Sequence, residues 1–406
     1  MRTTLRLCLA LVLGAIFING SRVVATPSAD VQQVVTGDNA FAADLYGRLR
    51  GQDGNLFFSP YSISTALAMT YAGARGDTAT QMAQTLHFNL PASDLPPAFA
   101  DLAAGLNAIQ QEGNIQLAIA NSLWPQKEFP FLPKYLALCQ KYYGAAVYPV
   151  DFIGHTEVTR QTINDWVSGK TNGKITDLLA PGSIDGARLV LVNAIYFKGN
   201  WVHRFQPDAT RDQPFHVSPE STTNASMMQQ AAEFGYAEFP DLQVLELPYA
   251  GNDVSMVVLL PRTVDGLGKL EQQLTATNLA AWTTNLLRQQ VRVFLPKFTA
   301  TSEFSLRDTL VAMGMTDAFD SGKADFSGMD GRRDLYISKV IHKAYVKVDE
   351  QGTEAAAATA VTMKFAGVMA QPPMPIFMAN HPFLFLIRDN RTGSVLFLGR
   401  MTNPTP

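Results

Sequence analysis

The sequence predicts an α+β fold with large mixed β-sheets and about eight to nine helices. Helical periodicity is concentrated before residue 171 and alternating strand patterns after residue 187, so the two kinds of element form segregated runs. No linker and no repeat period divides the 406 residues, of which 47% are apolar and 17% are charged. We therefore expect residues 26–406 to fold as a single domain with a sizeable core.

The helices are predicted from apolar spacing and from residues suited to a first turn. Apolar residues at helical spacing predict a helix over 30–50. Ser59 and Pro60 suit the start of a second helix, which runs to Tyr71. Further helices are expected from Gly76, from the end of a loop at 91–97 to about Gln111, around 135–139 and over 156–170.

Period-two patterns predict the strands. They cover residues 55–58, 115–123, 188–198, 242–247, 255–260, 291–298 and 340–348. Near the C-terminus, apolar runs at 377–387 and 394–400 are joined by a polar turn that contains Thr392 and Gly393. This pattern is typical of a β-hairpin.

The first 25 residues have the pattern of a secretory signal. Arg2 and Arg6 form its basic part, residues 7–18 form its apolar part, and Ala25 ends a plausible cleavage site, with Gly20 as a second choice. The apolar part is too short to span a bilayer comfortably. We therefore expect an exported protein, secreted to the extracellular space or held in the periplasm of a double-membraned bacterium.

Removal of this signal would leave one cysteine. Cys8 lies within the signal, so Cys139 would be the only cysteine of the mature chain and no internal disulfide could form. Cys139 falls in a helical pattern and is expected to be a buried structural thiol.

Residues 349–362 are compatible with two conformations. Their run of alanines favours a helix, because alanine has the highest helix propensity. The alternation is also that of a half-buried strand. One face of that strand would carry Thr353, Ala355, Ala357, Thr359, Val361, Met363 and Phe365. The segment therefore suits both an exposed loop or loose helix and a strand within a sheet.

This stretch, combined with the hairpin at 377–400, resembles the serpin family of serine-protease inhibitors. The resemblance extends from about Val31 to Asn403. It implies the serpin fold, in which an exposed reactive-centre loop presents a substrate-like strand to a target protease. That loop would lie here at about 350–376.

The resemblance also implies a mechanism. The protease serine forms an acyl-enzyme with the loop, and the cut loop then enters the main sheet as a new strand from Thr353 onward; serpin loop insertion is itself a standard example of strand addition. The hinge residues would be Glu350, Gly352, Thr353, Glu354, Ala355, Ala356, Ala357 and Ala358. The inward-facing ones are small, which favours an inhibitor over the alternative of a non-inhibitory serpin-like binding or chaperone protein.

The scissile bond is expected between Ala366 and Gly367, counted from Glu350 as in the family. The segment that follows this bond is longer than the family's usual spacing to the hairpin. The alternatives for the residue before the cut are therefore Lys364, Phe365 and Met369. An alanine there suits a protease of elastase or subtilisin type, whereas a lysine or a phenylalanine suits a trypsin-like or a chymotrypsin-like protease.

Other residues match positions that control entry of the loop in the family. Those beneath the centre of the main sheet, a region called the shutter, are Ser59, Ser62, Asn193 and His342. The end of the sheet where the loop begins to insert is called the breach, and Trp201 and Lys297 match residues there. Lys297 would form an ion pair with Glu350. An unpaired buried amide costs roughly 1–3 kcal/mol, so Asn193 is expected to have hydrogen-bond partners.

Other classes of function lack their motifs. The sequence has no nucleophile elbow, no zinc-protease motif and no phosphate loop, and its six histidines show no metal-ligand spacing, so we expect no enzyme activity, no cofactor and no metal site. The net charge of −3 and the lack of a basic tract argue against nucleic-acid binding. We expect no membrane association and a monomer whose partner is a serine protease. Sequons at Asn224 and Asn390 matter only where exported proteins are glycosylated.

Overall fold

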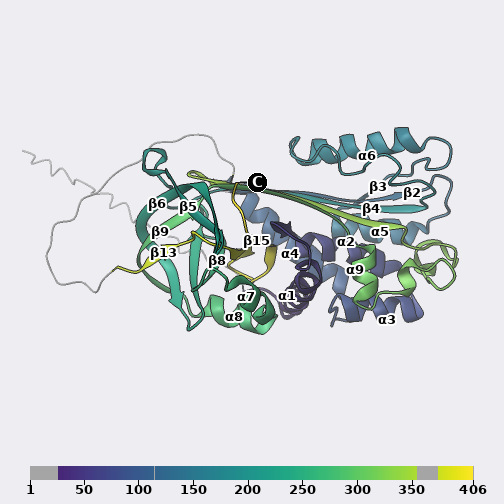
Figure 1. The fold of residues 1–406 in the computed structure, drawn as a ribbon. Helices are drawn as coiled ribbons and strands as arrows, with labels where there is room; N and C mark the ends of the chain where they lie inside the picture. Colours follow the sequence, from purple (N-terminus) through teal and green to yellow (C-terminus); the bar gives the residue numbers. More distant parts are fainter. Residues whose placement is uncertain (1–25, 114, 354–373, 406) are drawn as a thin grey trace, which may run out of the picture.

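The computed structural model describes residues 26–113, 115–353 and 374–405 (Figure 1). The ten α-helices within these ranges are α1 (Ala29–Leu49), α2 (Pro60–Gly73), α3 (Gly76–Thr85), α4 (Leu95–Gln111), α5 (Pro133–Tyr143), α6 (Thr156–Lys170), α7 (Leu267–Gln273), α8 (Ala276–Thr284), α9 (Arg307–Ala312) and α10 (Ser327–Asp330). The strands within them are β1 (Leu56–Phe58), β2 (Ile115–Pro125), β3 (Ala146–Val147), β4 (Leu189–Asn200), β5 (Arg211–Ser218), β6 (Ser221–Glu238), β7 (Leu242–Pro248), β8 (Val254–Pro261), β9 (Leu287–Pro296), β10 (Phe298–Ser305), β11 (Lys339–Asp349), β12 (Gly352–Thr353), β13 (Ile376–Met378), β14 (Phe383–Asp389) and β15 (Val395–Met401).

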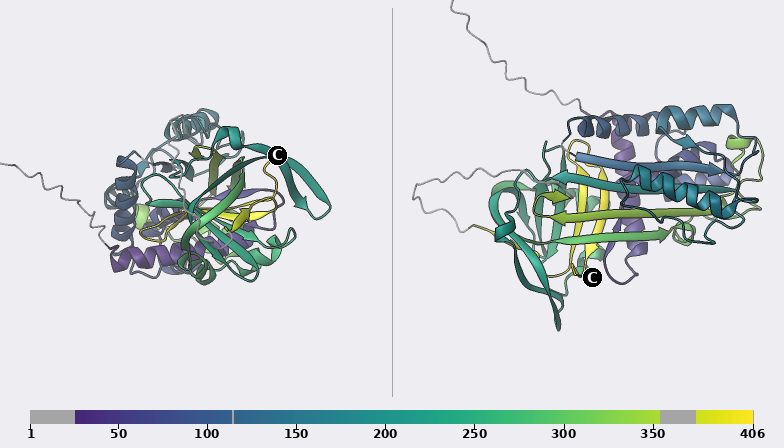
Figure 2. Two further views of the ribbon diagram at one scale, coloured as in Figure 1. Left: turned by 90° about the vertical axis from the view of Figure 1, so that its left-hand side faces the viewer. Right: turned by 90° about the horizontal axis from the view of Figure 1, so that it is seen from above.

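One sheet of the described chain has six strands in the order β10-β11-β12-β4-β2-β3. Its long central strands, β4 and β11, pair in parallel and set Asn193 opposite His342, while β2 pairs antiparallel with β4. Helix α6 covers one face of this sheet, and α2 lies against the other (Figures 1 and 2). This double cover explains why nearly every residue of β4 is buried.

The second sheet of the described chain has nine strands. It follows the path β1-β15-β14-β8-β7-β6-β9-β13, and β5 pairs with β6 beside this path. Strands β14 and β15 form the predicted C-terminal hairpin, in which Phe385 pairs with Gly399. The hairpin is confirmed, but its first arm is shorter than the predicted run 377–387, because residues 377–378 belong to β13. The short strand β13 pairs in parallel with β9 at the edge of the sheet.

Capping residues set the starts of the first helices. Ser28 Oγ accepts a hydrogen bond from the N–H of Val31 at 3.2 Å, and Ser59 Oγ accepts one from the N–H of Ser62 at 3.2 Å. Helix α4 begins at Leu95, inside the segment that the sequence predicted to be a loop. The two prolines that suggested a loop fit there because proline is tolerated in the first helical turn.

The core has two parts. The larger one joins α1, α2 and α4 to both sheets. The smaller one fills the space between α6 and the six-stranded sheet and includes Ile163, Val167, Val190 and Ile341. Cys139 is fully buried in the larger part, as expected, and burial raises the pKa of its thiol to about 11.

The strand predicted over 291–298 was wrong at its C-terminal boundary. Strand β9 ends at Pro296 and β10 begins at Phe298, and the chain passes at Lys297 from the nine-stranded sheet to the six-stranded one. The residue pattern remains strand-like through this crossing, so a local pattern could not separate the two strands. The crossing places Lys297 at the junction of the sheets.

Sequence patterns also missed the β5–β6 hairpin and helices α7 to α10. Most residues of β5 and of the N-terminal part of β6, next to the turn, are exposed or half-buried. The alternation of apolar and polar residues is therefore weak in both strands. Helices α9 and α10 have six and four residues, too few to display a helical period. Within the described ranges, no helix combines the length and the apolar character needed to cross a bilayer.

Candidate functional site

Gly352 and Thr353, two of the predicted hinge residues, enter the six-stranded sheet as β12. Thr353 pairs with Gly199 of β4 on one side and with Val348 of β11 on the other, antiparallel to both strands. Further along, β4 and β11 pair directly with each other. Strand β12 therefore occupies the first position of a strand that would have to separate β4 from β11 in order to continue.

Gly352 allows this entry because two backbones approach closely there. A Cβ atom at position 352 would lie 2.0 Å from the carbonyl oxygen of Gly199 and 2.7 Å from Cα of Asn200. Both atoms belong to the backbone of β4 and cannot move aside as a side chain would. Only glycine fits this position without displacing β4.

Thr353 is held by an aromatic pair at the end of the sheet. It is fully buried, and its Oγ1 lies 2.7 Å from the hydroxyl of Tyr249. The ring of Tyr249 stacks on Trp201 with centroids 4.5 Å apart, and Trp201 Nε1 donates to the carbonyl oxygen of Asp349 at 3.0 Å. Sequence reasoning named Thr353 and Trp201 but missed Tyr249, because no local pattern links the end of β7 to the hinge.

Glu350 and Lys297 form an ion pair beside this aromatic pair. Lys297 Nζ lies 2.9 Å from Oε2 of Glu350, and the hydroxyl of Thr210 donates to Oε1 at 2.8 Å. Burial alone would raise the pKa of Glu350, but the hydrogen bonds from Lys297, the backbone and Thr210 outweigh it and lower the pKa. The negatively charged carboxylate therefore ties the end of β11 to the junction of the two sheets.

A second network lies beneath the centre of the six-stranded sheet. His342 Nδ1 donates to Oδ1 of Asn193, and the N–H of Ser59 donates to His342 Nε2 at 3.0 Å. Asn193 Nδ2 lies 2.6 Å from the hydroxyl of Ser62 and 2.5 Å from Oδ1 of Asn121. The network therefore connects β4, β11 and β2 to the start of α2. Asn121 was missed by the sequence reasoning, although its position opposite Asn193 follows from the β2–β4 register.

The contacts of His342 fix its protonation state. Because Nε2 accepts a hydrogen bond from Ser59, the single proton of the neutral ring must lie on Nδ1, facing Asn193. Complete burial lowers the pKa of His342 to about 3. A proton on Nε2 would point at the N–H of Ser59, so the network requires the neutral ring.

Lys343 links β11 to the segment that follows α6. Its Nζ lies 2.9 Å from Oδ1 of Asp177 and 3.1 Å from Oε2 of Glu303. Lys174, in the same segment, has its Nζ 5.8 Å from the ring centroid of Tyr345 on β11. These contacts fasten the segment to β11, the strand that pairs with β4. No local pattern predicts this arrangement, because Asp177 and Lys343 are 166 positions apart.

The remaining predicted loop residues lie outside the described ranges. They are Glu354, Ala355, Ala356, Ala357, Ala358, Lys364, Phe365, Ala366, Gly367 and Met369. The chain is described again from Met374, and Ile376 of β13 pairs with Arg292 of β9. The two described ends of the loop thus belong to different sheets.

Metal and modification sites add little to this picture. Within the ranges that the structure describes, no group of three or more His, Cys, Asp or Glu side chains could hold a metal ion. Asn224 and Asn390 are both exposed, and the side-chain amide of Asn390 donates to the carbonyl oxygen of Asn252 at 2.9 Å.

Known proteins resemble this chain in both sequence and architecture. The family model described as serpin (serine protease inhibitor) matches residues 36–404. Leukocyte elastase inhibitor from Homo sapiens is 45% identical over 385 residues, which covers 92% of this chain and 100% of that protein. Leukocyte elastase inhibitor from Xenopus laevis is 43% identical over 373 residues, which covers 90% of this chain and 97% of that protein.

Two solved structures extend the comparison to the fold. Serpin48 of the insect Tenebrio molitor has a TM-score of 0.82 and 31% identity, and the match covers 92% of this chain and 98% of that one. Human thyroxine-binding globulin has a TM-score of 0.83 and 32% identity, with 93% and 100% covered. The nearly full-length match to the family model, together with identities above 40% over at least 97% of two relatives, shows that this chain belongs to the serpin family of serine protease inhibitors.

Proposed function

We propose that this protein is a suicide-substrate inhibitor of serine proteases that traps its target by inserting the cut loop into the six-stranded sheet. The observation that carries the proposal is the position of β12, because Thr353 is already paired on both sides, between β4 and β11. A strand that continued from Thr353 would next replace the direct pairs between β4 and β11. These pairings support the proposed entry point and direction of insertion.

Inhibition would begin as ordinary proteolysis. The protease serine attacks the carbonyl carbon of the scissile bond, the C–N bond breaks, the new amino terminus leaves, and an ester joins the loop to the protease. Residues 353–365 would then insert and span about 43 Å at about 3.3 Å per residue, which carries the protease away from its docking point. In the serpin mechanism, this displacement distorts the active site of the protease. A distorted active site cannot deacylate, since loss of one oxyanion donor alone slows such a step by about 10²–10³.

The pairing pattern supplies part of the driving force. Strands β4 and β11 pair in parallel from Val190 and Lys339 to Tyr196 and Tyr345. A strand running in the direction of β12 would pair antiparallel with both of them, and antiparallel ladders are slightly more stable per residue than parallel ones. The hydrogen bond between Asn193 and His342 crosses the line of separation, so insertion must break or rearrange it.

The proposed target is a protease of elastase or subtilisin type that cuts between Ala366 and Gly367. The small residue before the cut supports this specificity, and the human relative at 45% identity is named leukocyte elastase inhibitor. The partner would bind as one protease to one inhibitor monomer. Lys364 and Phe365 keep trypsin-like and chymotrypsin-like proteases in the comparison.

The test is incubation with an elastase, subtilisin, trypsin and chymotrypsin, followed by denaturing gels and mass spectrometry of the released C-terminal peptide. We expect a denaturant-stable band of higher mass with the elastase or subtilisin and a peptide that begins at Gly367. A complex whose peptide begins elsewhere would move the scissile bond. Clean cleavage by every protease, without a higher-mass band, would reject inhibition.

We further propose that residues 1–25 are a secretory signal and that the mature protein acts outside the cytoplasm, in the extracellular space or the periplasm. The basic start, short apolar run and small residues support this. Expression of the complete chain in a secreting host should yield exported protein whose N-terminus, read by mass spectrometry, is Thr26 or, for the second cleavage choice, Ser21. An intact N-terminus on cell-retained protein would overturn it.

A non-inhibitory binding or chaperone protein is the second candidate. Human thyroxine-binding globulin, whose name states a ligand, shares the fold at a TM-score of 0.83, so the fold itself is compatible with ligand binding. The small hinge residues favour inhibition, because bulky or charged inward residues would obstruct insertion. In the protease experiment, this candidate predicts cleaved product and no stable complex.

A further inference from the structure

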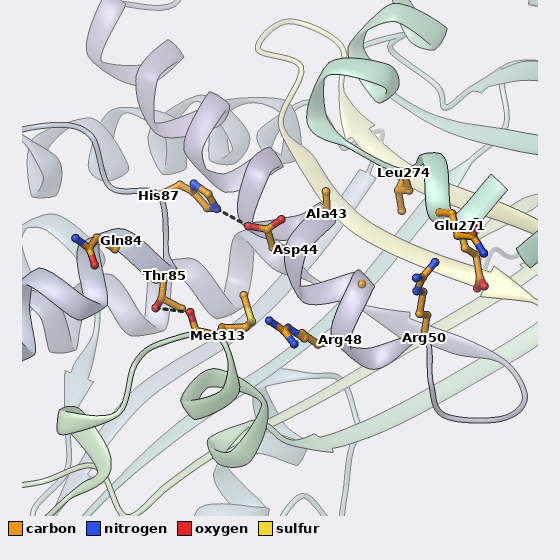
Figure 3. Close-up of a pocket in the computed structure, with 12 residues that line it drawn as sticks. Ala43, Asp44, Arg48, Arg50, Gln84, Thr85, His87, Glu271, Leu274 and Met313 are labelled. Carbon is orange, nitrogen blue, oxygen red and sulfur yellow. Dashed lines mark hydrogen bonds and ion pairs between the residues drawn. The ribbon is translucent and has the colours of Figure 1, made fainter. Parts of the chain in front are cut away.

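A polar cleft is lined by residues of α1, α3 and α7 and by Met313 after α9 (Figure 3), and it includes none of the predicted hinge or shutter residues. Its volume is about 470 Å³, within the range of clefts that hold small molecules. The residues that line it are Ala43, Asp44, Gly47, Arg48, Arg50, Gln84, Thr85, His87, Glu271, Gln272, Leu274 and Met313. Most of these side chains are polar, so the cleft suits a polar ligand.

The two acidic groups of the cleft already have polar partners. Asp44 Oδ2 lies 2.7 Å from His87 Nε2. Glu271 Oε1 accepts hydrogen bonds from the hydroxyl of Tyr46 at 2.6 Å and from Arg400 Nη1 at 2.9 Å. Neither carboxylate therefore needs the cleft arginines as partners.

The cleft arginines are left uncompensated. Arg48 and Arg50 project from the C-terminal end of α1, and no hydrogen bond or ion pair joins either guanidinium to another described residue (Figure 3). Arginines near a helix C-terminus often bond the last carbonyl groups, but neither does so here. Each guanidinium is planar and can donate two parallel N–H hydrogen bonds to one carboxylate or phosphate group. Two such groups in one polar cleft therefore match a ligand with two carboxylate or phosphate groups.

We propose that this cleft binds a small organic anion of metabolite size that carries two acidic groups. Arg48 and Arg50 would each hold one group, and the amides of Gln84 and Gln272 would contact the polar body between them. The site lies apart from the breach and the shutter, so it does not depend on protease inhibition. The shared chemistry fits either phosphate or carboxylate groups.

Gly47 provides a means of closing the cleft without weakening the fold. It directly precedes Arg48 in α1 and lines the cleft, and a Cβ atom added there meets nothing within 4 Å. Replacement of a glycine in a helix by a better helix former stabilises the helix by roughly 0.5–1 kcal/mol. Gly47→Leu should therefore fill the cleft while the melting temperature stays the same or rises.

Isothermal titration calorimetry of the intact mature protein tests the proposal, with inorganic tripolyphosphate and citrate as separate probes and orthophosphate for comparison. We expect one of the two multivalent probes to bind at a single site and more tightly than orthophosphate, with an affinity that falls as salt rises. Arg48→Gln and Arg50→Gln should each weaken binding by at least about tenfold, the effect of losing a charge-assisted hydrogen bond. Arg292→Gln, which changes an exposed arginine on β9, is the matched control and should leave binding unchanged.

The outcomes separate a ligand in the cleft from one on the surface. Loss of binding in Gly47→Leu, with unchanged or higher melting temperature, supports the cleft. Binding that survives Gly47→Leu but is lost with either arginine means that the anion lies on the outer surface of α1, and the proposed site is then wrong. The absence of saturable binding by both multivalent probes at millimolar concentration also overturns it.

Discussion

Thr353 is the residue at which a change should convert the inhibitor into a substrate. It is fully buried between β4 and β11, and Tyr249 holds its hydroxyl. In Thr353→Arg, β12 would have to bury an unpaired charge, which costs roughly 3–5 kcal/mol, or leave its place between β4 and β11, so the insertion that starts from β12 should slow. We expect the stoichiometry of inhibition to rise strongly while the rate of loop cleavage stays the same, measured by titration of the protease and by gel. Thr353→Ser keeps the hydroxyl and is the control, and an unchanged stoichiometry in Thr353→Arg would show that residue 353 does not enter the sheet.

His342 should make the intact protein sensitive to acid. Burial lowers the pKa of His342 in the folded protein to about 3 from an ordinary value of 6.5. At a pH between these two pKa values, the ring is protonated in the unfolded chain and neutral in the folded protein. The stability that the neutral ring contributes is therefore complete above about pH 6.5 and is lost as pH falls toward 3. The slope approaches about 1.4 kcal/mol per pH unit, which is about 2 kcal/mol by pH 5.

The comparison variant for this effect is His342→Gln, which keeps hydrogen-bonding atoms in the shutter and removes the titrating group. Thermal unfolding of both proteins should be followed from about pH 7 to about pH 5. We expect the melting temperature of the wild-type protein to fall more steeply with acid than that of the variant. Parallel curves would mean that the ring is not held neutral in the folded protein.

At the scale of elements, the segment after α6 is predicted to restrain insertion. Lys343 and Asp177 fasten it to β11, and Asp177 is 80% exposed whereas Lys343 is 11% exposed. Asp177→Asn would release this contact and leave Lys343 paired with Glu303. Because such a pair is worth about 0.2–1 kcal/mol after solvent screening, we expect insertion to become up to about fivefold faster.

The rate of insertion can be followed by stopped-flow fluorescence of a labelled loop after protease is added. Asp185→Asn is the matched control, because Asp185 is an exposed carboxylate of the same segment for which the described chain shows no partner. High salt should reduce the difference between Asp177→Asn and the wild-type protein. Equal insertion rates in low salt for the two variants would exclude a restraining role for this ion pair.

At the scale of the whole molecule, cleavage of the loop should raise thermal stability. A nick usually leaves a protein equally or less stable, because chain entropy rises. Here the cut would let residues after Thr353 form a strand with ladder bonds on both edges and one buried apolar face. Calorimetry before and after a nick mapped to residues 364–370 should show a much higher melting temperature for the cleaved form. A cleaved form that melts at or below the intact one would favour the non-inhibitory alternative.

Many of the helices and strands could be predicted from the local sequence. The C-terminal hairpin, the helix that begins after Ser59 and the long strand at 340–348 all followed from period and capping. These features depend on side chains within a few positions of one another. The predicted C-terminal boundary of the strand at 291–298 was wrong for the same reason, because a local pattern does not show that the chain passes to the other sheet at Lys297.

The sequence by itself determined the family and named most of the residues that meet around β12, because motifs and resemblance depend on the order of residues in the chain. Only the tertiary structure decided which partners complete the site. Tyr249 meets Thr353 from 104 positions away, Asn121 meets Asn193 from 72, and Asp177 meets Lys343 from 166. Such contacts exist because sheet pairing and helix packing bring distant segments together, and no local periodicity encodes that arrangement.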